Sequence, residues 1–279
     1  MTRPLTIDLS NLPPLRDALA AHGLLAKKSF GQHFLLDLNI TRKIARLAEV
    51  GEDDLVIEVG PGPGGLTRAL LETGARVIAV EKDPRFAPLL VELAEASAGA
   101  LTLVQADALT IDETELAGPG PAHVVSNLPY NVGTPLLIKW LTGPFTPASL
   151  TLMFQKEVAE RIVAAPGADA YGRLAVIAQA TAQARLVMDV GARAFTPPPK
   201  VDSAVVRLVP DPKRLDAALL AALQAVTAAA FGQRRKMLRS SLKGLGGEAL
   251  CQAAGLSADA RAETISVAGF LDLARATLS

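Results

Sequence analysis

The sequence lacks the features of secreted proteins and of proteins with cysteine-ligated metals. Cys251 is the single cysteine, so neither an intrachain disulfide nor a cysteine-based zinc site can form. This cysteine content is consistent with a protein that works in a reducing compartment. We predict that Cys251 is a small, buried, apolar residue. The N-terminal residues lack the charged-then-apolar pattern of a signal peptide. We therefore expect a cytoplasmic protein without a bound metal.

Long apolar runs and aromatic residues are also scarce. The most apolar stretch, residues 217–231, is short and is interrupted by Gln224 and Thr227, so it predicts a buried helix rather than a membrane span. Aromatic residues make up only 4% of the chain, so the core must consist mainly of Ala, Leu and Val. The formal net charge of zero counts against indiscriminate nucleic-acid binding but permits a local basic surface.

What is present is an alternation of strand-like and helix-like segments. We predict a first helix within residues 11–28 with Gly23 as a stop, a basic loop at 27–35, and a helix at 38–50. Beyond these, strands are predicted at 55–59, 77–80, 101–104, 124–125 and 150–154, and helices at 66–72, 84–96 and 136–141. Short apolar strands that alternate with helices predict a parallel sheet covered on both faces.

The pattern changes in the last third of the chain. Residues 183–190 and 204–209 are strand-like runs with no helix between them, which predicts an antiparallel hairpin at the sheet edge. After Pro210 the chain is predicted to be helical to its end, with a break at residues 244–247. We therefore predict a first domain over residues 1–210 and a small helical domain over 211–279.

A glycine-rich loop, residues 58–65, closes the first strand of the alternating region and opens a helix. It satisfies G-x-G-x-x-G through Gly60, Gly62 and Gly65, a motif that is weak alone and stronger between a strand and a helix. Glycines permit a tight turn and close approach of a ligand, and the helix start offers free N–H groups. The loop therefore favours a nucleoside-cofactor site over a plain turn.

Acidic residues follow the next two strands. Glu81 ends the second strand, where a carboxylate can accept two hydrogen bonds from ribose hydroxyls. Asp107 follows the third strand and could accept from an adenine amino group, although it could equally cap the turn after it. In an open α/β sheet the carboxyl ends of neighbouring strands are where ligands bind, so the two acids together predict a cofactor site.

The fourth strand ends in Asn127, Leu128, Pro129 and Tyr130. An amide oxygen and a neighbouring backbone carbonyl can accept hydrogen bonds from a planar exocyclic amine, and an aromatic ring can stack on the base that carries it. Alone, the tetrapeptide is as easily a strand-to-loop turn. Beside the glycine loop and the two acids, it favours S-adenosylmethionine over a dinucleotide, because it provides adenine recognition and a place for a nucleophilic amine.

Several further segments occur in a familiar order along nearly the whole chain: 28–35, 58–65, 127–131, 155–161, 171–174, 195–203 and 231–239. In these segments the chain resembles the KsgA/RsmA family of ribosomal RNA adenine N6,N6-dimethyltransferases. The resemblance implies a Rossmann-like, class I methyltransferase sheet, mostly parallel, with seven strands and an antiparallel edge hairpin. It also implies transfer of methyl groups from S-adenosylmethionine to N6 of two adjacent adenines in the 3′-terminal hairpin of 16S rRNA, and a role in small-subunit ribosome biogenesis.

The resemblance further implies residue roles. The cofactor contacts would be His33, Leu35, Gly60, Gly62, Glu81, Asp107 and Asn127, where His33 occupies a position that is often Asn in the family. The target amine would be held by Asn127 and by the Leu128 or Pro129 carbonyl. Tyr130 and Phe195 would sandwich the unstacked adenine.

Basic residues predict where RNA would bind. They form two groups along the chain, and the candidates for RNA contact are Lys27, Lys28, Arg234, Arg235, Lys236 and Arg239. The expected partner is 16S rRNA, within the small ribosomal subunit or its precursor, and we expect a monomer without membrane contact.

Two alternatives stay open. An NAD(P)-linked oxidoreductase would use the glycine loop for a pyrophosphate, and it would bind nicotinamide cofactors but not S-adenosylmethionine. A non-catalytic ribosome-assembly or transcription factor would keep the fold and lose the chemistry, although the intact Asn127 and Tyr130 argue against that loss.

Overall fold

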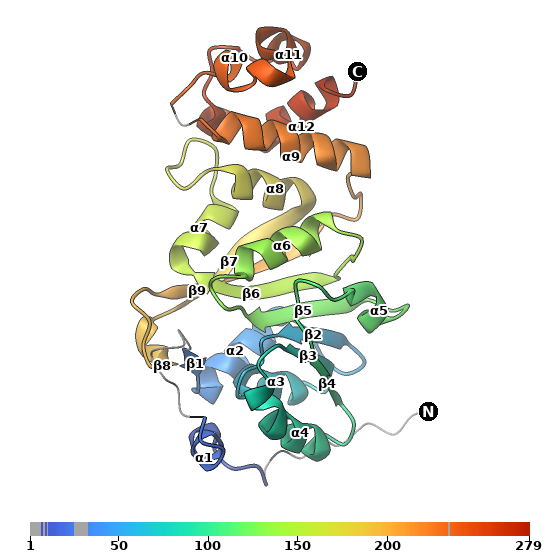
Figure 1. The fold of residues 1–279 in the computed structure, drawn as a ribbon, viewed down its shortest axis with the longest axis vertical. Coiled ribbons are helices and arrows are strands. Elements are labelled where there is room, and N and C mark those ends of the chain that lie inside the picture. The colour runs from blue at the N-terminus through green and yellow to red at the C-terminus, as the bar shows by residue number, and fades with distance from the viewer. Residues whose placement is uncertain (1–6, 8, 10, 25–32, 234) are drawn as a thin grey trace. The chain divides into compact units, whose positions relative to one another are not determined.

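The computed structural model describes residues 7, 9, 11–24, 33–233 and 235–279, which form two compact units (Figure 1). The first unit contains Met1–Lys156 and Leu186–Leu208, and the second contains Glu157–Arg185 and Val209–Ser279. The domain division predicted at residue 210 differs from these two units in one segment. Residues 157–185 belong with the C-terminal helices. The reason is packing: α8 (Arg173–Thr181) contacts α9 (Ala217–Phe231) and α12 (Val267–Ala276).

The first unit is built on a seven-stranded sheet in the order β4-β3-β2-β5-β6-β9-β7. Its strands are β2 (Leu55–Val59), β3 (Arg76–Glu81), β4 (Leu101–Gln105), β5 (Ala122–Asn127), β6 (Ser149–Gln155), β7 (Ala182–Val190) and β9 (Ser203–Pro210). The pairs among β2 to β6 are parallel, whereas β9 runs antiparallel to β6. The mostly parallel seven-stranded sheet is confirmed, and the two late strands lie at its edge with β7 outermost.

Burial explains why these strands show no polar–apolar alternation. Every residue of β6 before Gln155 is buried, and so are Val56 to Val59 of β2. A strand buried on both sides needs helices over both faces of its sheet. In the first unit these helices are α2 (Leu38–Ala48), α3 (Gly65–Leu71), α4 (Ala87–Ala96), α5 (Glu113–Ala117) and α6 (Gly133–Thr142), with the 3-10 turn η2 (Pro84–Phe86) before α4.

The chain direction across the sheet reverses between β2 and β5. From β2 the chain steps outward to β3 and β4, and it then returns to β5 on the other side of β2. Right-handed crossovers on opposite sides of this point place their helices on opposite faces of the sheet. The loops at the carboxyl ends of β2 and β5 therefore diverge and leave a crevice between them.

Two short segments complete the first unit beside this crevice. β1 (Phe34–Leu35) pairs antiparallel with β8 (Phe195–Thr196), which follows the 3-10 turn η3 (Ala192–Ala194). The first helix, α1, spans only Leu15–Ala21 of the range predicted for it. Pro14 follows Pro13, and a residue before proline disfavours helical backbone, so the helix begins late. Gly23 follows it at φ +66°, as a stop requires.

The second unit is helical. Its elements are α7 (Lys156–Val163), α8, α9, α10 (Leu238–Ser241), η4 (Lys243–Leu245), α11 (Gly247–Ala253), η5 (Ala262–Thr264) and α12. The rings of Phe231 and Phe270 stack with their centroids 5.3 Å apart. The buried Tyr171 hydroxyl donates a hydrogen bond to the Ile265 carbonyl at 2.8 Å. The predicted helix at 217–231 is confirmed, as is burial of Cys251. Within the described residues, no helix is long and apolar enough to span a bilayer.

Candidate functional site

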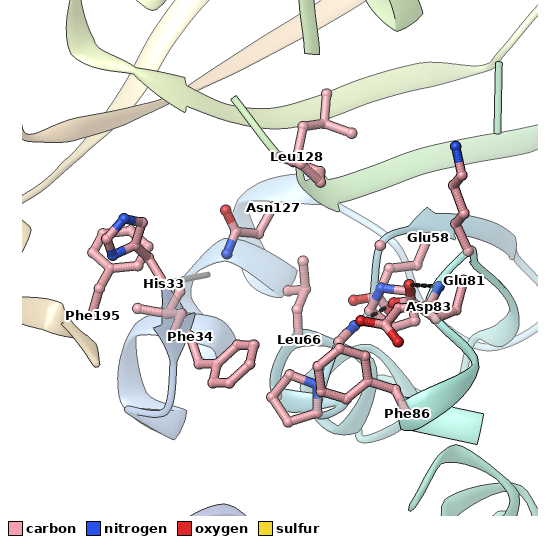
Figure 2. A pocket seen from close by; sticks show the side chains of 18 of the residues that line it. His33, Phe34, Glu58, Leu66, Glu81, Asp83, Phe86, Asn127, Leu128 and Phe195 are labelled. Atoms are coloured by element: carbon pink, nitrogen blue, oxygen red, sulfur yellow. Dashed lines mark hydrogen bonds between the residues drawn. The ribbon is translucent and has the colours of Figure 1, made fainter. Parts of the chain in front are cut away.

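A cavity of about 740 Å³ lies at the carboxyl ends of β2, β3 and β5 in the first unit. It is lined by five segments that are distant in sequence: residues 33–35, 58–66, 81–86, 127–131 and Phe195. Figure 2 shows Asn127 between the side of the cavity formed by His33 and Phe195 and the side formed by Glu58 and Glu81. The sheet topology thus brings together most of the residues predicted from sequence, at the crevice where α/β sheets bind ligands.

The glycine loop forms the floor between β2 and α3. Gly60 and Gly62 have φ values of +69° and +52°, a left-handed conformation that glycine adopts without steric cost. Gly65 is needed for a different reason, because a Cβ there would lie 2.7 Å from the Leu35 backbone oxygen. The loop is therefore shaped both by its turn and by close contact with β1.

Glu81 ties this loop to the end of β3. Its Oε2 accepts a hydrogen bond from the Gly62 N–H at 3.0 Å, and its Oε1 accepts from the Asp83 N–H at 2.8 Å. Burial raises the pKa of the Glu81 carboxyl, although the two N–H donors oppose that effect. A carboxylate has about four lone-pair sites, so Glu81 can hold the loop and still accept two hydroxyl groups.

Glu58 is the chemically unusual residue that the sequence did not single out. It lies on β2, lines the cavity and is only 1% exposed, and its Oε2 has no hydrogen-bond partner among the described residues. Burial, helped by the charge of Glu81, raises the pKa of Glu58 to about 8. The carboxyl is therefore mainly protonated at neutral pH. From the sequence it is only the first residue of the glycine-rich segment 58–65, since its burial depends on the neighbouring strands.

Asn127 and Leu128 end β5 on the far side of the loop. The Asn127 side chain lines the cavity and makes no hydrogen bond to a described residue. The Pro129 carbonyl already accepts the N–H groups of Val132 and Gly133, both at 3.1 Å, where α6 begins. Of the two carbonyls suggested from sequence, the structure therefore favours Leu128 as the partner of Asn127 in holding an amine.

Aromatic rings border the same corner. The rings of Tyr130 and His33 stack with centroids 6.3 Å apart, and the Tyr130 hydroxyl lies 3.1 Å from Ser203 Oγ. His33 Nδ1 lies 2.7 Å from the Pro197 carbonyl, which can only accept, so Nδ1 carries the proton and Nε2 is an acceptor in the neutral ring. Phe195 lines the cavity but is 3% exposed, because it pairs with Leu35 in the β1–β8 ribbon.

Asp107 is the one predicted pocket residue that the structure leaves outside the cavity lining. Its Oδ2 pairs with Lys82 Nζ at 2.7 Å, and its Oδ1 accepts the Leu109 N–H at 3.0 Å. The Lys82 ammonium, aided by the Leu109 N–H, lowers the pKa of Asp107, so the carboxylate is charged. It caps the turn in this structure, and its contact with an adenine stays a prediction.

The predicted RNA-contacting residues fall into two groups. Lys27, Lys28 and Arg234 lie outside the described residues. Arg235, Lys236 and Arg239 are exposed on the second unit, where Arg239 pairs with Asp259 at 2.7 Å. Part of that positive charge is thus offset within the protein.

Comparison with known proteins gives a consistent result. The model of a family described as ribosomal RNA adenine dimethylase matches residues 23–277. The Phenylobacterium zucineum protein named ribosomal RNA small subunit methyltransferase A is 77% identical over 273 residues, which cover 98% of this chain and 95% of that protein. Its namesake in Caulobacter vibrioides is 74% identical over 254 residues, or 91% of this chain and 98% of that one.

Two solved structures are similar to this chain as well. One is a dimethyladenosine transferase from Plasmodium falciparum, with a TM-score of 0.73 and 25% identity over 86% of this chain and 96% of that one. The other is the 23S rRNA methyltransferase ErmE, with a TM-score of 0.67 and 29% identity over 88% of this chain and 100% of that one.

Proposed function

Because the chain belongs to the ribosomal RNA adenine dimethylase family, we propose that it methylates N6 of adenines in small-subunit ribosomal RNA. It is an S-adenosylmethionine-dependent methyltransferase. The observation that carries the proposal is one cavity that joins the glycine loop and Glu81 to the free amide of Asn127. An oxidoreductase on the same fold is disfavoured by the family match.

The residues on the loop side of the cavity fit the methyl donor. Glu81 has acceptor sites left for the two ribose hydroxyls, and Gly62 and Gly65 allow close approach to the backbone. The Oε2 of Glu58, which has no hydrogen-bond partner among the described residues, can accept from a cationic group such as the ammonium of an amino-acid tail, and that cation would favour the ionised carboxylate over the protonated form. When bound, S-adenosylmethionine supplies an electrophilic methyl group on a sulfonium.

Asn127 and Leu128 would prepare the target amine. The nitrogen of adenine N6 is a poor nucleophile, since its lone pair is delocalised into the ring. Hydrogen bonds from its N–H groups to the Asn127 amide oxygen and the Leu128 carbonyl raise the electron density on nitrogen and orient the lone pair. Positioning and fixed dipoles thus provide the rate acceleration, and the methylated nitrogen can lose its proton to water without a dedicated base.

The base must leave its stack to reach this corner. Tyr130 is half-buried at the cavity and offers a ring for stacking, and Phe195 lines the same cavity as the proposed second aromatic contact. In the tautomer set by the Pro197 carbonyl, the Nε2 of His33 is a further acceptor beside Tyr130.

We also propose the specific products and the RNA target of the reaction. The products are two adjacent N6,N6-dimethyladenosines in the 3′-terminal hairpin of 16S rRNA, made during small-subunit assembly in the cytoplasm, where that RNA is found. Exposed Arg235 and Lys236 of the second unit support phosphate contact and predict salt-dependent binding. A monomeric state stays a prediction.

The test compares Asn127→Ala with Asn39→Ala, the same change at an exposed position of α2. Losing one fixed acceptor is expected to slow methyl transfer about 100-fold or more, with only a modest loss of cofactor affinity. Transfer is measured by mass spectrometry of 16S rRNA from cells that lack the protein and carry each variant. Normal dimethylation by Asn127→Ala would refute the amine-holding role, and unmodified RNA with every variant, including the natural chain, would refute the proposed reaction.

A further inference from the structure

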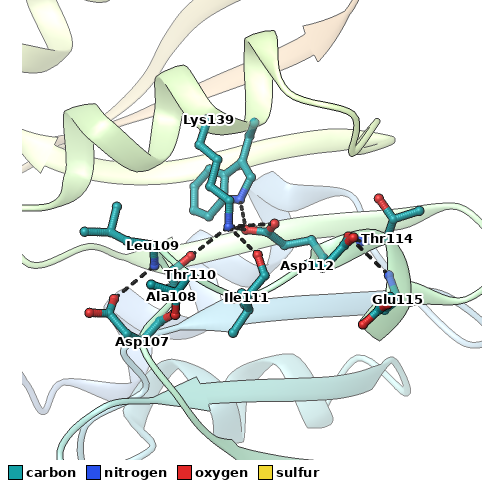
Figure 3. A network of polar contacts seen from close by, with 11 residues as sticks. Asp107, Ala108, Leu109, Thr110, Ile111, Asp112, Thr114, Glu115 and Lys139 are labelled. Carbon is teal, nitrogen blue, oxygen red and sulfur yellow. Dashed lines mark hydrogen bonds and ion pairs between the residues drawn. The ribbon is translucent and has the colours of Figure 1, made fainter.

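A partly buried ion pair between Lys139 and Glu113 links α6 to the start of α5, and the same lysine binds the loop between β4 and α5 (Figure 3). Lys139 Nζ donates to the Ala108 carbonyl at 2.9 Å, to the Ile111 carbonyl at 2.7 Å and to Glu113 Oε1 at 2.9 Å. The Trp140 indole N–H donates to the same Glu113 oxygen at 2.7 Å. All three N–H bonds of the ammonium are thus used, and two of them hold loop backbone.

Stability alone does not account for this arrangement. The Glu113 side chain is 2% exposed and that of Lys139 is 27% exposed, so both charges have lost much of their hydration. Apolar side chains of similar volume in place of a buried ion pair are often as stable or more stable. What the ammonium provides, and an apolar side chain cannot, is a set of directed bonds that fix the path of residues 108–111.

That path sets the position of Asp107. Asp107 immediately precedes the held carbonyl of Ala108, and its carboxylate accepts the Leu109 N–H inside the same loop. Lys82, which pairs with Asp107, lines the cofactor cavity. The charge of Lys139 also contributes to the lowered pKa of Asp107. The loop therefore holds a charged acceptor beside the cavity, and Lys139 anchors the loop.

We propose that Lys139 is a positioning residue for cofactor recognition. Together with Glu113, it holds the loop at 107–112 so that the Asp107 carboxylate accepts the amino group of the cofactor's adenine. The inference rests on the proposed function, since it assigns a role within the same cofactor site. It predicts that breaking the ion pair weakens recognition of the adenine amine in particular, rather than cofactor binding in general.

The test measures recognition of that amine as a ratio of two affinities. Calorimetry gives Kd for S-adenosylhomocysteine and for its deaminated analogue S-inosylhomocysteine, which carries a carbonyl in place of the amine. A hydrogen bond to a charged acceptor makes the first ligand bind roughly 10- to 100-fold more tightly in the natural chain. Asp107→Ala is the reference variant and is expected to reduce this ratio to about threefold or less.

The decisive variant is the double substitution Lys139→Met with Glu113→Gln. It removes both charges, so no unpaired carboxylate stays buried, and the glutamine oxygen can still accept from Trp140. Lys139→Met alone serves for comparison, and fluorescence of Trp140 in a urea titration verifies that each variant is folded. We expect the double variant to lose most of the preference for the adenine ligand, and adding Asp107→Ala to it should change the ratio no further.

The possible outcomes distinguish a failure of this inference from a failure of the proposed function. A folded double variant that keeps the full preference, while Asp107→Ala loses it, overturns the role of Lys139. An equal loss of affinity for both ligands also overturns it, since that pattern is a general structural effect. Equal affinities in the natural chain overturn the Asp107 contact and the inference with it, whereas the methyl-transfer proposal is judged by RNA mass spectrometry.

Discussion

Glu58→Gln should change how the stability of the first unit depends on pH. Glu58 is 1% exposed, and burial raises the pKa of its carboxyl from 4.5 to about 8. The folded protein therefore holds a proton that the unfolded chain releases above pH 4.5. The stability linked to this group is complete below pH 4.5, declines as the pH rises, and is fully lost once the pH passes about 8.

The size of this effect follows from the same two values. At about 1.4 kcal/mol for each pH unit, the interval from 4.5 to about 8 corresponds to roughly 5 kcal/mol in the free energy of unfolding. Glutamine resembles the protonated acid in shape and does not ionise. The variant should therefore gain up to that amount relative to the natural chain between pH 4.5 and 8, on top of an offset that does not depend on pH.

Trp140 provides the assay, because it is the only tryptophan, is 1% exposed, and lies in the first unit. Urea unfolding is followed by its fluorescence at several pH values for both proteins, and other titrating groups cancel in the difference. Glu95→Gln, at an exposed position of α4, controls for the loss of a carboxylate. A difference between Glu58→Gln and the natural chain that is constant with pH would refute the reasoning.

Two further predictions concern a close backbone contact and a buried hydrogen bond. Gly65→Ala should weaken cofactor binding at least 10-fold in calorimetry, since its Cβ would meet the Leu35 backbone oxygen at 2.7 Å, whereas Gly120→Ala, with nothing within 4 Å, should bind normally. Equal cofactor affinity of the two variants would contradict this prediction, because it would mean that β1 shifts at little cost to make room for the Cβ. Tyr171→Phe should lower the stability of the second unit by about 1–2 kcal/mol in thermal unfolding, because the Ile265 carbonyl loses its buried donor. An unchanged midpoint would mean that the carbonyl finds another partner.

Much of the fold could be predicted because its signals are local. Runs such as Leu55–Val59 and Ser149–Gln155 are apolar over the length of a strand, and Gly23 and Gly74 stop the segments before them. The positions of Glu81 and Asn127 at strand ends were enough to place them in one site, because parallel strands bring their carboxyl ends to one edge.

The parts that sequence could not predict depend on distant neighbours. Glu58 becomes a buried, mainly protonated acid only when the strands beside it have assembled. The Pro129 carbonyl accepts hydrogen bonds from the first turn of α6, which favours Leu128 as the amine acceptor, although the motif itself does not distinguish the two. Residues 157–185 join the C-terminal helices through contacts with α9 and α12, and no change in composition marks that junction.

The β1–β8 ribbon also bears on how the protein is made. His33 and Pro197 are separated by 164 positions, and their hydrogen bond joins the two segments that form one wall of the cavity. A nascent chain that has already formed β2 to β6 still lacks this wall, because Phe195 and Pro197 leave the ribosome later. The ribbon needs both of its strands, so β1 has no partner until residues 195 and 196 have been made. This wall of the cavity is therefore completed only after the residues of β8, in the last third of the chain, have been synthesised.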